Sequence, residues 1–144
     1  MYYSTLINNR ADYGGAIYMG GGSSNSSIFN SSFINNVAKY NGGAIDWNAT
    51  GGGLTDTEFT GNVAAFGGAL CREEGAIGGY GSGNGFISNH ATQSGGALAW
   101  IGSIGINITN YFFYNNTAQN GGAIYVGPGA EKCLIKDCVF IENS

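Results

Sequence analysis

Apolar residues in this chain come in short alternating runs that are broken by glycine and asparagine, a pattern typical of short β-strands joined by tight turns. In one such stretch, Ile108 and Phe113 are followed by Asn110 and Asn116, and Ile124 then opens another apolar run. These runs do not show the 3.6-residue period of an amphipathic helix. The pattern therefore predicts about three short strands per stretch and no substantial helix.

Two linked motifs recur along the chain with a period of about 27 residues. Gly-Gly-Ala followed by Ile or Leu occurs five times, beginning at Gly14, Gly42, Gly67, Gly95 and Gly121. The second motif is Phe-x-x-Asn, found at Phe33 and Asn36, Phe59 and Asn62, Phe86 and Asn89, Phe113 and Asn116, and Phe140 and Asn143. Leu6 and Asn9 open this series in a conservative form. A fixed period of this length indicates a stacked repeat architecture.

Short strands that each pair with their equivalents in the next repeat describe a parallel β-helix. Parallel crossovers are overwhelmingly right-handed. The sequence therefore predicts an all-β fold over residues 1–144, a single right-handed parallel β-helix (solenoid) segment of about five coils with roughly 27 residues per coil. Because neither end carries an obvious polar cap, we expect this segment to be an excerpt of a longer repeat array.

Equivalent residues of adjacent coils lie about 4.8 Å apart, so repeated side chains are expected to stack. The Phe positions and Leu6 are predicted to form an internal stack, and the Asn positions from Asn9 to Asn143 an amide ladder at the following turn. A second, imperfect ladder is expected three residues before each Phe, at Asn30, Asp56, Gly83, Asn110 and Asp137. The aliphatic residues after Gly-Gly-Ala should line a second inner wall, consisting of Ile17, Ile45, Leu70, Leu98 and Ile124. The two glycines are expected to form a tight corner, and the residues between Asn and Gly-Gly an outward turn.

Composition and charge narrow the class of protein. The chain has 27 glycines among 144 residues, which argues against a helical bundle because each glycine costs a helix about 1 kcal/mol relative to alanine. The net charge of -4 argues against a nucleic-acid partner, which would need clustered Lys and Arg. No run of apolar residues is long enough for a membrane span, so this segment is not expected to insert into a membrane.

The sequence offers no convincing catalytic, cofactor-binding or metal-binding set. Polysaccharide lyases and hydrolases need acidic or basic side chains gathered on one face of adjacent coils. The position after the aliphatic wall, predicted to face outward, reads Tyr18, Asp46, Cys71, Ala99 and Tyr125, and thus carries a single carboxylate. Asp46 and Arg72 are expected to form at most a surface ion pair, Glu73 and Glu74 a solvated loop tip, and His90 a solvent-facing turn residue. Cys71, Cys133 and Cys138 fit neither a disulfide framework nor a zinc-ligand spacing.

Aromatic side chains on the outside are the best candidates for contacts with a partner. Tyr18, Tyr111, Tyr114 and Tyr125 are predicted to be such surface residues, since exposed aromatics contact sugars and proteins favourably. Trp47 and Trp100 are expected to face inward instead, because they share a repeat position with Met19 and Val126.

The linked Gly-Gly-Ala-Ile/Leu and Phe-x-x-Asn motifs resemble the repeats of the chlamydial-type polymorphic outer membrane proteins and of similar adhesin-like surface proteins. The resemblance runs from Leu6 to Asn143, and only Leu6 departs from the Phe pattern. It implies a secreted or surface-associated β-helix, often exported as the passenger of an autotransporter and used for adhesion to host cells. The expected location is extracellular or on the outer membrane.

We therefore expect a non-catalytic repeat module without a cofactor, which presents loops for attachment to a protein or glycan on a host or neighbouring cell. The regular interior and irregular exterior support this interpretation, since scaffold and recognition are then separate. The alternative is a carbohydrate-active β-helix, of the polysaccharide lyase or hydrolase type, whose catalytic coils lie outside this segment.

Overall fold

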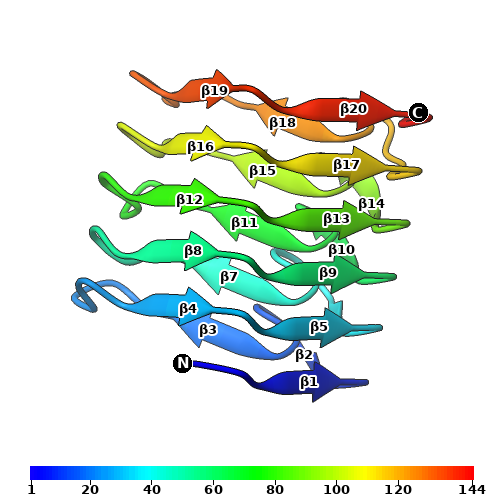
Figure 1. Cartoon of the computed structure of the whole chain (residues 1–144), viewed down its shortest axis with the longest axis horizontal. Helices are drawn as coiled ribbons and strands as arrows, with labels where there is room; N and C mark the ends of the chain where they lie inside the picture. The colour runs from blue at the N-terminus through cyan, green and yellow to red at the C-terminus, as the bar shows by residue number, and fades with distance from the viewer.

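Equivalent strands of successive repeats pair in parallel, so that each repeat becomes one coil of a β-solenoid. A computed structural model describes residues 1–144, and in it the coils rise in chain order from the N-terminus to the C-terminus (Figure 1). Strand partners follow the sequence repeat, for example Phe59 opposite Phe86 and Leu70 opposite Leu98. The prediction of an all-β parallel solenoid of about five coils is confirmed. The chain has no helix with the length and apolarity that crossing a membrane requires.

Four parallel sheets run along the solenoid, and each is named for its position in the coil or for the residues it carries. The phenylalanine sheet contains β1 (Thr5–Ile7), β5 (Ser32–Ile34), β9 (Glu58–Thr60), β13 (Gly85–Ile87), β17 (Phe112–Tyr114) and β20 (Val139–Ile141). The corner sheet contains β2 (Arg10–Ala11), β6 (Val37–Ala38), β10 (Val63–Phe66) and β14 (His90–Ser94).

The other two sheets follow the Gly-Gly-Ala motif. The aliphatic sheet contains β3 (Ile17–Met19), β7 (Ile45–Trp47), β11 (Leu70–Arg72), β15 (Leu98–Trp100) and β18 (Ile124–Val126). The rim sheet contains β4 (Ser27–Phe29), β8 (Gly53–Thr55), β12 (Tyr80–Ser82), β16 (Asn107–Thr109) and β19 (Leu134–Lys136). The rim and phenylalanine sheets lie side by side on the near side of Figure 1, with the aliphatic sheet behind them.

Each complete coil therefore has up to four strands rather than the expected three. The additional strand lies in the connection between the ladder asparagine and Gly-Gly, which was expected to be an outward turn. In this connection Ala38, Ala64 and Ala91 point inward and are buried, and Val63 pairs with both Val37 and His90. A small inward residue lets the connection pack against the core, so its backbone continues the sheet hydrogen bonding.

Aromatic and amide columns fill the interior as the repeats predict. The rings of Phe33, Phe59, Phe86 and Phe113 are fully buried, and consecutive ring centroids lie 4.7–5.2 Å apart. Phe140 continues this stack 4.8 Å from Phe113. Their spacing matches the strand separation and is close to that of favourable offset stacking. The phenylalanine column is thus one part of the apolar core, which also contains the aliphatic wall and the two tryptophans.

The ladder asparagines link every coil to the next. Both the main-chain and the side-chain nitrogen of Asn62 donate to Oδ1 of Asn89, at 2.9 Å each, and Asn89 donates in the same way to Asn116 at 3.0 Å. The side-chain nitrogen also donates to a phenylalanine carbonyl of the preceding coil, such as that of Phe59 for Asn89. Equivalent bonds run from Asn9 to Asn36, from Asn36 to Asn62 and from Asn116 to Asn143. The amides thereby satisfy turn backbone groups that are shielded from water.

The second predicted ladder is wrong. The residues three positions before each Phe are all exposed. Their φ angles are positive and run from 46° at Asn30 to 67° at Gly83, with Asp56, Asn110 and Asp137 in between. These residues make the turn between the rim and phenylalanine sheets, where Asn, Asp and Gly tolerate the left-handed conformation.

A second ladder does exist one residue further along. The amide N–H of Ser4 donates to Ser31 Oγ at 3.2 Å, that of Ser31 to Thr57 Oγ1 at 3.4 Å, and that of Thr57 to Asn84 Oδ1 at 2.9 Å. Ser, Thr and Asn differ in shape, so this column was less visible in the sequence than the uniform asparagine ladder.

The Gly-Gly corner is as tight as the motif predicts. A Cβ on Gly96 would lie 2.0 Å from the carbonyl oxygen of Gly122 in the next coil, too close for any side chain. The preceding Gly95 has a φ of 70°, which glycine adopts without strain. The corner turns the chain into the aliphatic sheet, where Ile45, Leu70 and Leu98 are buried as the second inner wall.

Candidate functional site

A groove of about 1110 Å³ lies along the loops that follow the aliphatic sheet. Its lining comes from several coils and consists of Asn41, Asn48, Phe66, Glu73, Glu74, Ile77, Ile101, Gly102, Ile104, Tyr125, Pro128 and Gly129. The loops 73–79, 101–106 and 127–133 join the aliphatic sheet to the rim sheet and vary in sequence while the strands they join repeat. The groove therefore combines apolar, acidic and amide side chains on a face that the repeat does not constrain.

The middle of the column after the aliphatic wall is buried rather than on the surface. Strand register places Tyr18, Asp46, Cys71, Ala99 and Tyr125 one above another. Asp46, Cys71 and Ala99 are fully buried, so the prediction that this column faces solvent is wrong for its middle members. The loops that follow the strands fold over these small residues, and their course could not be deduced from the repeat.

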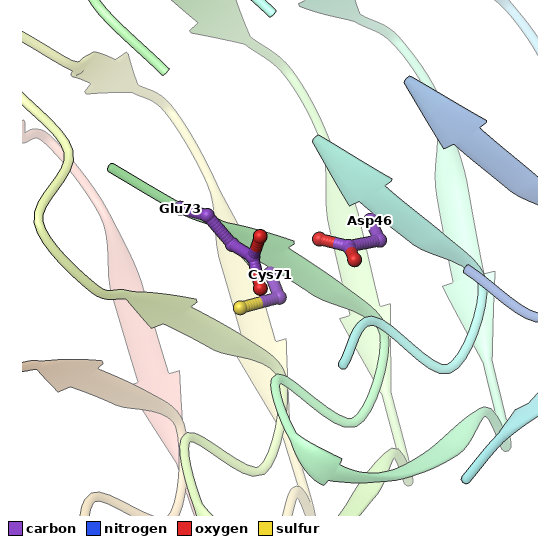
Figure 2. A group of neighbouring side chains, drawn as sticks. All are labelled: Asp46, Cys71 and Glu73. Carbon is purple, nitrogen blue, oxygen red and sulfur yellow. The ribbon is translucent and has the colours of Figure 1, made fainter. Parts of the chain in front are cut away.

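Asp46, Cys71 and Glu73 come together beside the groove, and of the three only Glu73 lines it (Figure 2). A carboxylate oxygen of Asp46, the Sγ of Cys71 and a carboxylate oxygen of Glu73 all lie within 4.8 Å of one another. Asp46 and Cys71 are opposite each other in β7 and β11, while Glu73 is the first residue of the loop after β11. Asn41 donates a side-chain hydrogen bond to Glu73 Oε1. Glu73, expected at a solvated loop tip, is half-buried.

Burial sets the ionisation of this cluster. Neither carboxylate oxygen of Asp46 has a hydrogen-bond partner. Burial, reinforced by the nearby charge of Glu73, raises the Asp46 pKa from 3.8 to about 7. Burial and the charges of Asp46 and Glu73 also raise the pKa of Cys71 well above 9.0. At neutral pH the free thiol is therefore protonated, and Cys71 lacks the thiolate that nucleophilic cysteines require.

Arg72 does not pair with Asp46, contrary to the expectation from the sequence. Its side chain points into the core, where the guanidinium lies 4.4 Å from the ring centroid of Trp47, and it is almost fully buried. Burial lowers the Arg72 pKa to about 10. The register puts Arg72 between Trp47 and Trp100, both of which are buried as expected. Arg72 occupies an inward position of its column, while Asp46 belongs to the neighbouring outward one.

The four predicted surface tyrosines divide into three groups. Tyr18 is 56% exposed and Tyr114 is 37% exposed, whereas Tyr125 is half-buried and lines the groove. Tyr111 is only 2% exposed, so its prediction as a surface contact is wrong. It occupies the place that Asn84 has in the preceding coil, and its ring packs 5.6 Å from that of Phe86. The large ring fills the interior in place of a smaller ladder residue.

Tyr13 and Tyr40 are exposed as well, although the sequence did not single them out as surface contacts. Tyr13 lies 5.1 Å from Tyr40 and 6.4 Å from Tyr18 between ring centroids, so the three form a tyrosine cluster on the surface. Tyr18 is in the same column as Asp46, and Tyr40 precedes the groove residue Asn41. Their positions next to the Gly-Gly corners were the available signal. His90 is exposed, and its Nδ1 lies 2.7 Å from Thr117 Oγ1.

Comparison with known proteins gives one family. Residues 30–46 and 110–127 match the family model described as the Chlamydia polymorphic membrane protein (Chlamydia_PMP) repeat. Each matched segment contains one Phe-x-x-Asn motif and the following Gly-Gly-Ala-Ile. Neither the curated proteins nor the solved structures give a significant match. Two segments of this solenoid are therefore similar to the polymorphic membrane protein repeat, the family that the linked motifs resemble.

Proposed function

We propose that this chain is a non-catalytic, adhesin-like module of an outer-membrane or surface-associated protein, which attaches to a protein or glycan on a host or neighbouring cell. The repeat family and the β-solenoid fold both fit a surface module of this kind. The observation that carries the proposal is the division between a largely repeated interior and an irregular face. On that face the groove and the tyrosine cluster of Tyr13, Tyr18 and Tyr40 form what is called here the attachment face.

The attachment face has the chemistry that binds proteins and sugars. Exposed tyrosine rings offer large apolar surfaces with a polar end and lose little conformational entropy when they are covered. The groove adds the amides of Asn41 and Asn48 and the carboxylate of Glu74, which can hydrogen-bond to a polar ligand. Rigid sheets beneath hold these groups in place, so binding does not have to order the scaffold.

Burial also favours binding over catalysis. Asp46 and Glu73 are two carboxylates near one another, as glycoside hydrolysis requires, but Asp46 has no exposed surface. A sugar in the groove would have no direct contact with the Asp46 carboxylate. This geometry supports a role in which the groove holds a ligand without transforming it.

The test is attachment of the purified chain to cultured host cells and to neighbouring microbial cells. A variant in which Tyr13, Tyr18 and Tyr40 are all replaced by Ala should lose most of the binding. The matched control replaces Tyr80 and Tyr114, which are exposed on other sheets, and should bind as the parent does. Equal binding by both variants would place attachment on another face.

Two further results would overturn the proposal itself. One is binding no stronger than that of a β-solenoid unrelated in sequence. The other is the release of reducing ends or unsaturated products from acidic polysaccharides incubated with the chain, which would reveal a catalytic activity.

A further inference from the structure

The buried carboxylate of Asp46 lacks any compensating group in the protein. Its side chain is fully buried, both oxygens are without hydrogen-bond partners, and it points toward Cys71 and Glu73 (Figure 2). Arg72, the nearest cationic residue in the register, points into the core against Trp47. An isolated buried carboxylate is strongly unfavourable unless it is paired or coordinates a cation.

The three side chains supply a donor set that discriminates between metals. A cysteine sulfur with two carboxylate oxygens suits Zn²⁺, which accepts both sulfur and oxygen ligands. Mg²⁺ and Ca²⁺ prefer six or more oxygen ligands and have little affinity for sulfur. The composition of the cluster therefore favours Zn²⁺ over these two hard cations.

The geometry is close to that of a zinc site. Tetrahedral zinc with a sulfur at about 2.3 Å and oxygens at about 2.1 Å separates its ligand atoms by roughly 3.5 Å. The donor atoms of Asp46, Cys71 and Glu73 lie within 4.8 Å of one another. Asp46 and Cys71 face each other in paired strands and Glu73 begins a loop, so small changes of side-chain rotamer can bring the three donor atoms to this separation. Asn41 already orients the Glu73 carboxylate through a hydrogen bond, as outer-shell partners of metal ligands do.

We propose that Asp46, Cys71 and Glu73 bind Zn²⁺ beside the groove, at the wall that Glu73 lines, with one coordination position left open on the Glu73 side. On binding, a bond forms between zinc and the Cys71 sulfur, and the thiol proton is released to solvent. The ion neutralises the buried Asp46 carboxylate and ties the loop 73–79 to β7 and β11. Zinc thus stabilises the wall of the groove, and its open position accepts water or an anionic group of a ligand.

The residue spacing did not reveal this site because its ligands come from two different repeats. Asp46 and Cys71 are 25 residues apart in the sequence and become neighbours only through strand pairing. Metal motifs that can be read from a sequence have much shorter spacings within each ligand pair.

The experiment titrates the full chain, purified with a reductant and freed of metal by a chelator, with ZnCl₂ in a calorimeter. We expect saturation at one equivalent of zinc and release of protons, measured from the dependence of the heat on the buffer. With CoCl₂, a sulfur-to-cobalt charge-transfer band should appear. Saturation at one equivalent with CaCl₂ or MgCl₂ that persists in the Cys71→Ser variant would overturn the proposal, because it would indicate an oxygen-only site.

Variants separate the proposed ligands from their neighbours. Asp46→Asn, Cys71→Ser and Glu73→Gln should each weaken zinc binding by about tenfold or more, and Cys71→Ser should abolish the cobalt band. The matched controls Glu74→Gln and Cys133→Ser should bind zinc as the parent does. Glu73 lies outside the strands, so Glu73→Gln tests the site without disturbing the fold. Unchanged binding in Glu73→Gln and Cys71→Ser, or no zinc binding by the parent chain, would refute the assignment.

Discussion

The asparagine ladder makes a quantitative prediction about the stability of the solenoid, and Asn89 in its centre is the best place to test it. Its Oδ1 accepts hydrogen bonds from the main-chain and side-chain nitrogens of Asn62. Its own side-chain nitrogen donates to the carbonyl of Phe59 and to Asn116 Oδ1, both at 3.0 Å. Asn89→Ala removes these four bonds while leaving the strands and the phenylalanine column in place.

The loss of folding free energy in Asn89→Ala follows from the buried polar groups that lose a hydrogen-bond partner. The side-chain nitrogen of Asn62 keeps its bond to the carbonyl of Phe33, and Asn116 Oδ1 keeps its bond from the main-chain nitrogen of residue 89. The main-chain N–H of Asn62 and the carbonyl of Phe59 lose the ladder bonds that they make with Asn89. The Asn62 N–H is left buried and unpaired, which costs about 1–3 kcal/mol, while the Phe59 carbonyl stays in the paired strand β9 and loses one bond worth about 0.5–1.5 kcal/mol. The free energy of unfolding should therefore fall by about 1.5–4.5 kcal/mol.

Equilibrium unfolding in urea measures this change. Far-UV circular dichroism follows the sheets, and fluorescence follows the buried Trp47 and Trp100. Asn107→Ala is the control, since the Asn107 side chain is exposed and makes no hydrogen bond within the chain. It should change the free energy of unfolding by less than about 0.5 kcal/mol. Asn89→Asp keeps the acceptor but loses the donors and buries a charge, so it should be at least as destabilising as Asn89→Ala at pH 7. If the free energies of unfolding of Asn89→Ala and Asn107→Ala differ by less than about 1 kcal/mol, a structural role for the ladder is refuted.

Three further predictions follow from packing and burial. Phe86→Ala removes a fully buried ring stacked between two others and should lower the free energy of unfolding by about 3–5 kcal/mol, whereas Tyr18→Ala should change it little. Equal losses at the two positions in urea unfolding would contradict the assignment of Phe86 to the interior and Tyr18 to the surface. Gly96→Ala places a Cβ 2.0 Å from a backbone oxygen and should lower the free energy of unfolding by about 3 kcal/mol or more, while the Cβ of Gly21→Ala meets no atom within 4 Å and should be neutral. Thermal unfolding compares the two variants, and similar melting temperatures would show that the corner can relax. In metal-free buffer, the raised pKa of Asp46 means that the folded protein binds more protons than the unfolded chain between about pH 4 and 7. The free energy of unfolding should therefore fall as the pH rises through this range, by about 4 kcal/mol in total. Asp46→Asn should remove this dependence and be more stable than the parent at pH 8 in urea unfolding, and a variant that kept the full pH dependence would show that another group causes it.

The fold was predictable because its interior repeats the same residue types in every coil. Phe86 and Asn89 recur at a fixed period, and stacking of like side chains is the physical reason that they do. The additional strand around Ala64 was missed because the residues between the ladder asparagine and Gly-Gly differ in type and number from coil to coil. Tyr111 was misplaced because, in a single coil, a large ring substitutes for a smaller residue of a column that varies in composition.

The groove was not predictable, because it depends on loops that the repeat leaves free. Asp46 sits at an outward position, and only the course of the loops explains why it is buried. Glu73 looks like a solvated residue in the sequence, yet its loop brings it back over Cys71. Arg72 is the clearest case, since an arginine at an inward position goes against the preference for apolar cores, and stacking on Trp47 is what accommodates it.

The one-directional pattern of the asparagine ladder has a consequence for how such arrays change in length. Every coil offers the same acceptor to the coil before it and the same donors to the coil after it, so each junction is chemically equivalent. Recombination that adds or deletes a complete 27-residue unit leaves every junction matched, whereas an insertion of a few residues within a strand shifts all later amides out of place. Genes encoding such arrays can therefore vary in repeat number and in loop sequence with little loss of stability, which lets a surface module alter its reach and its ligands separately.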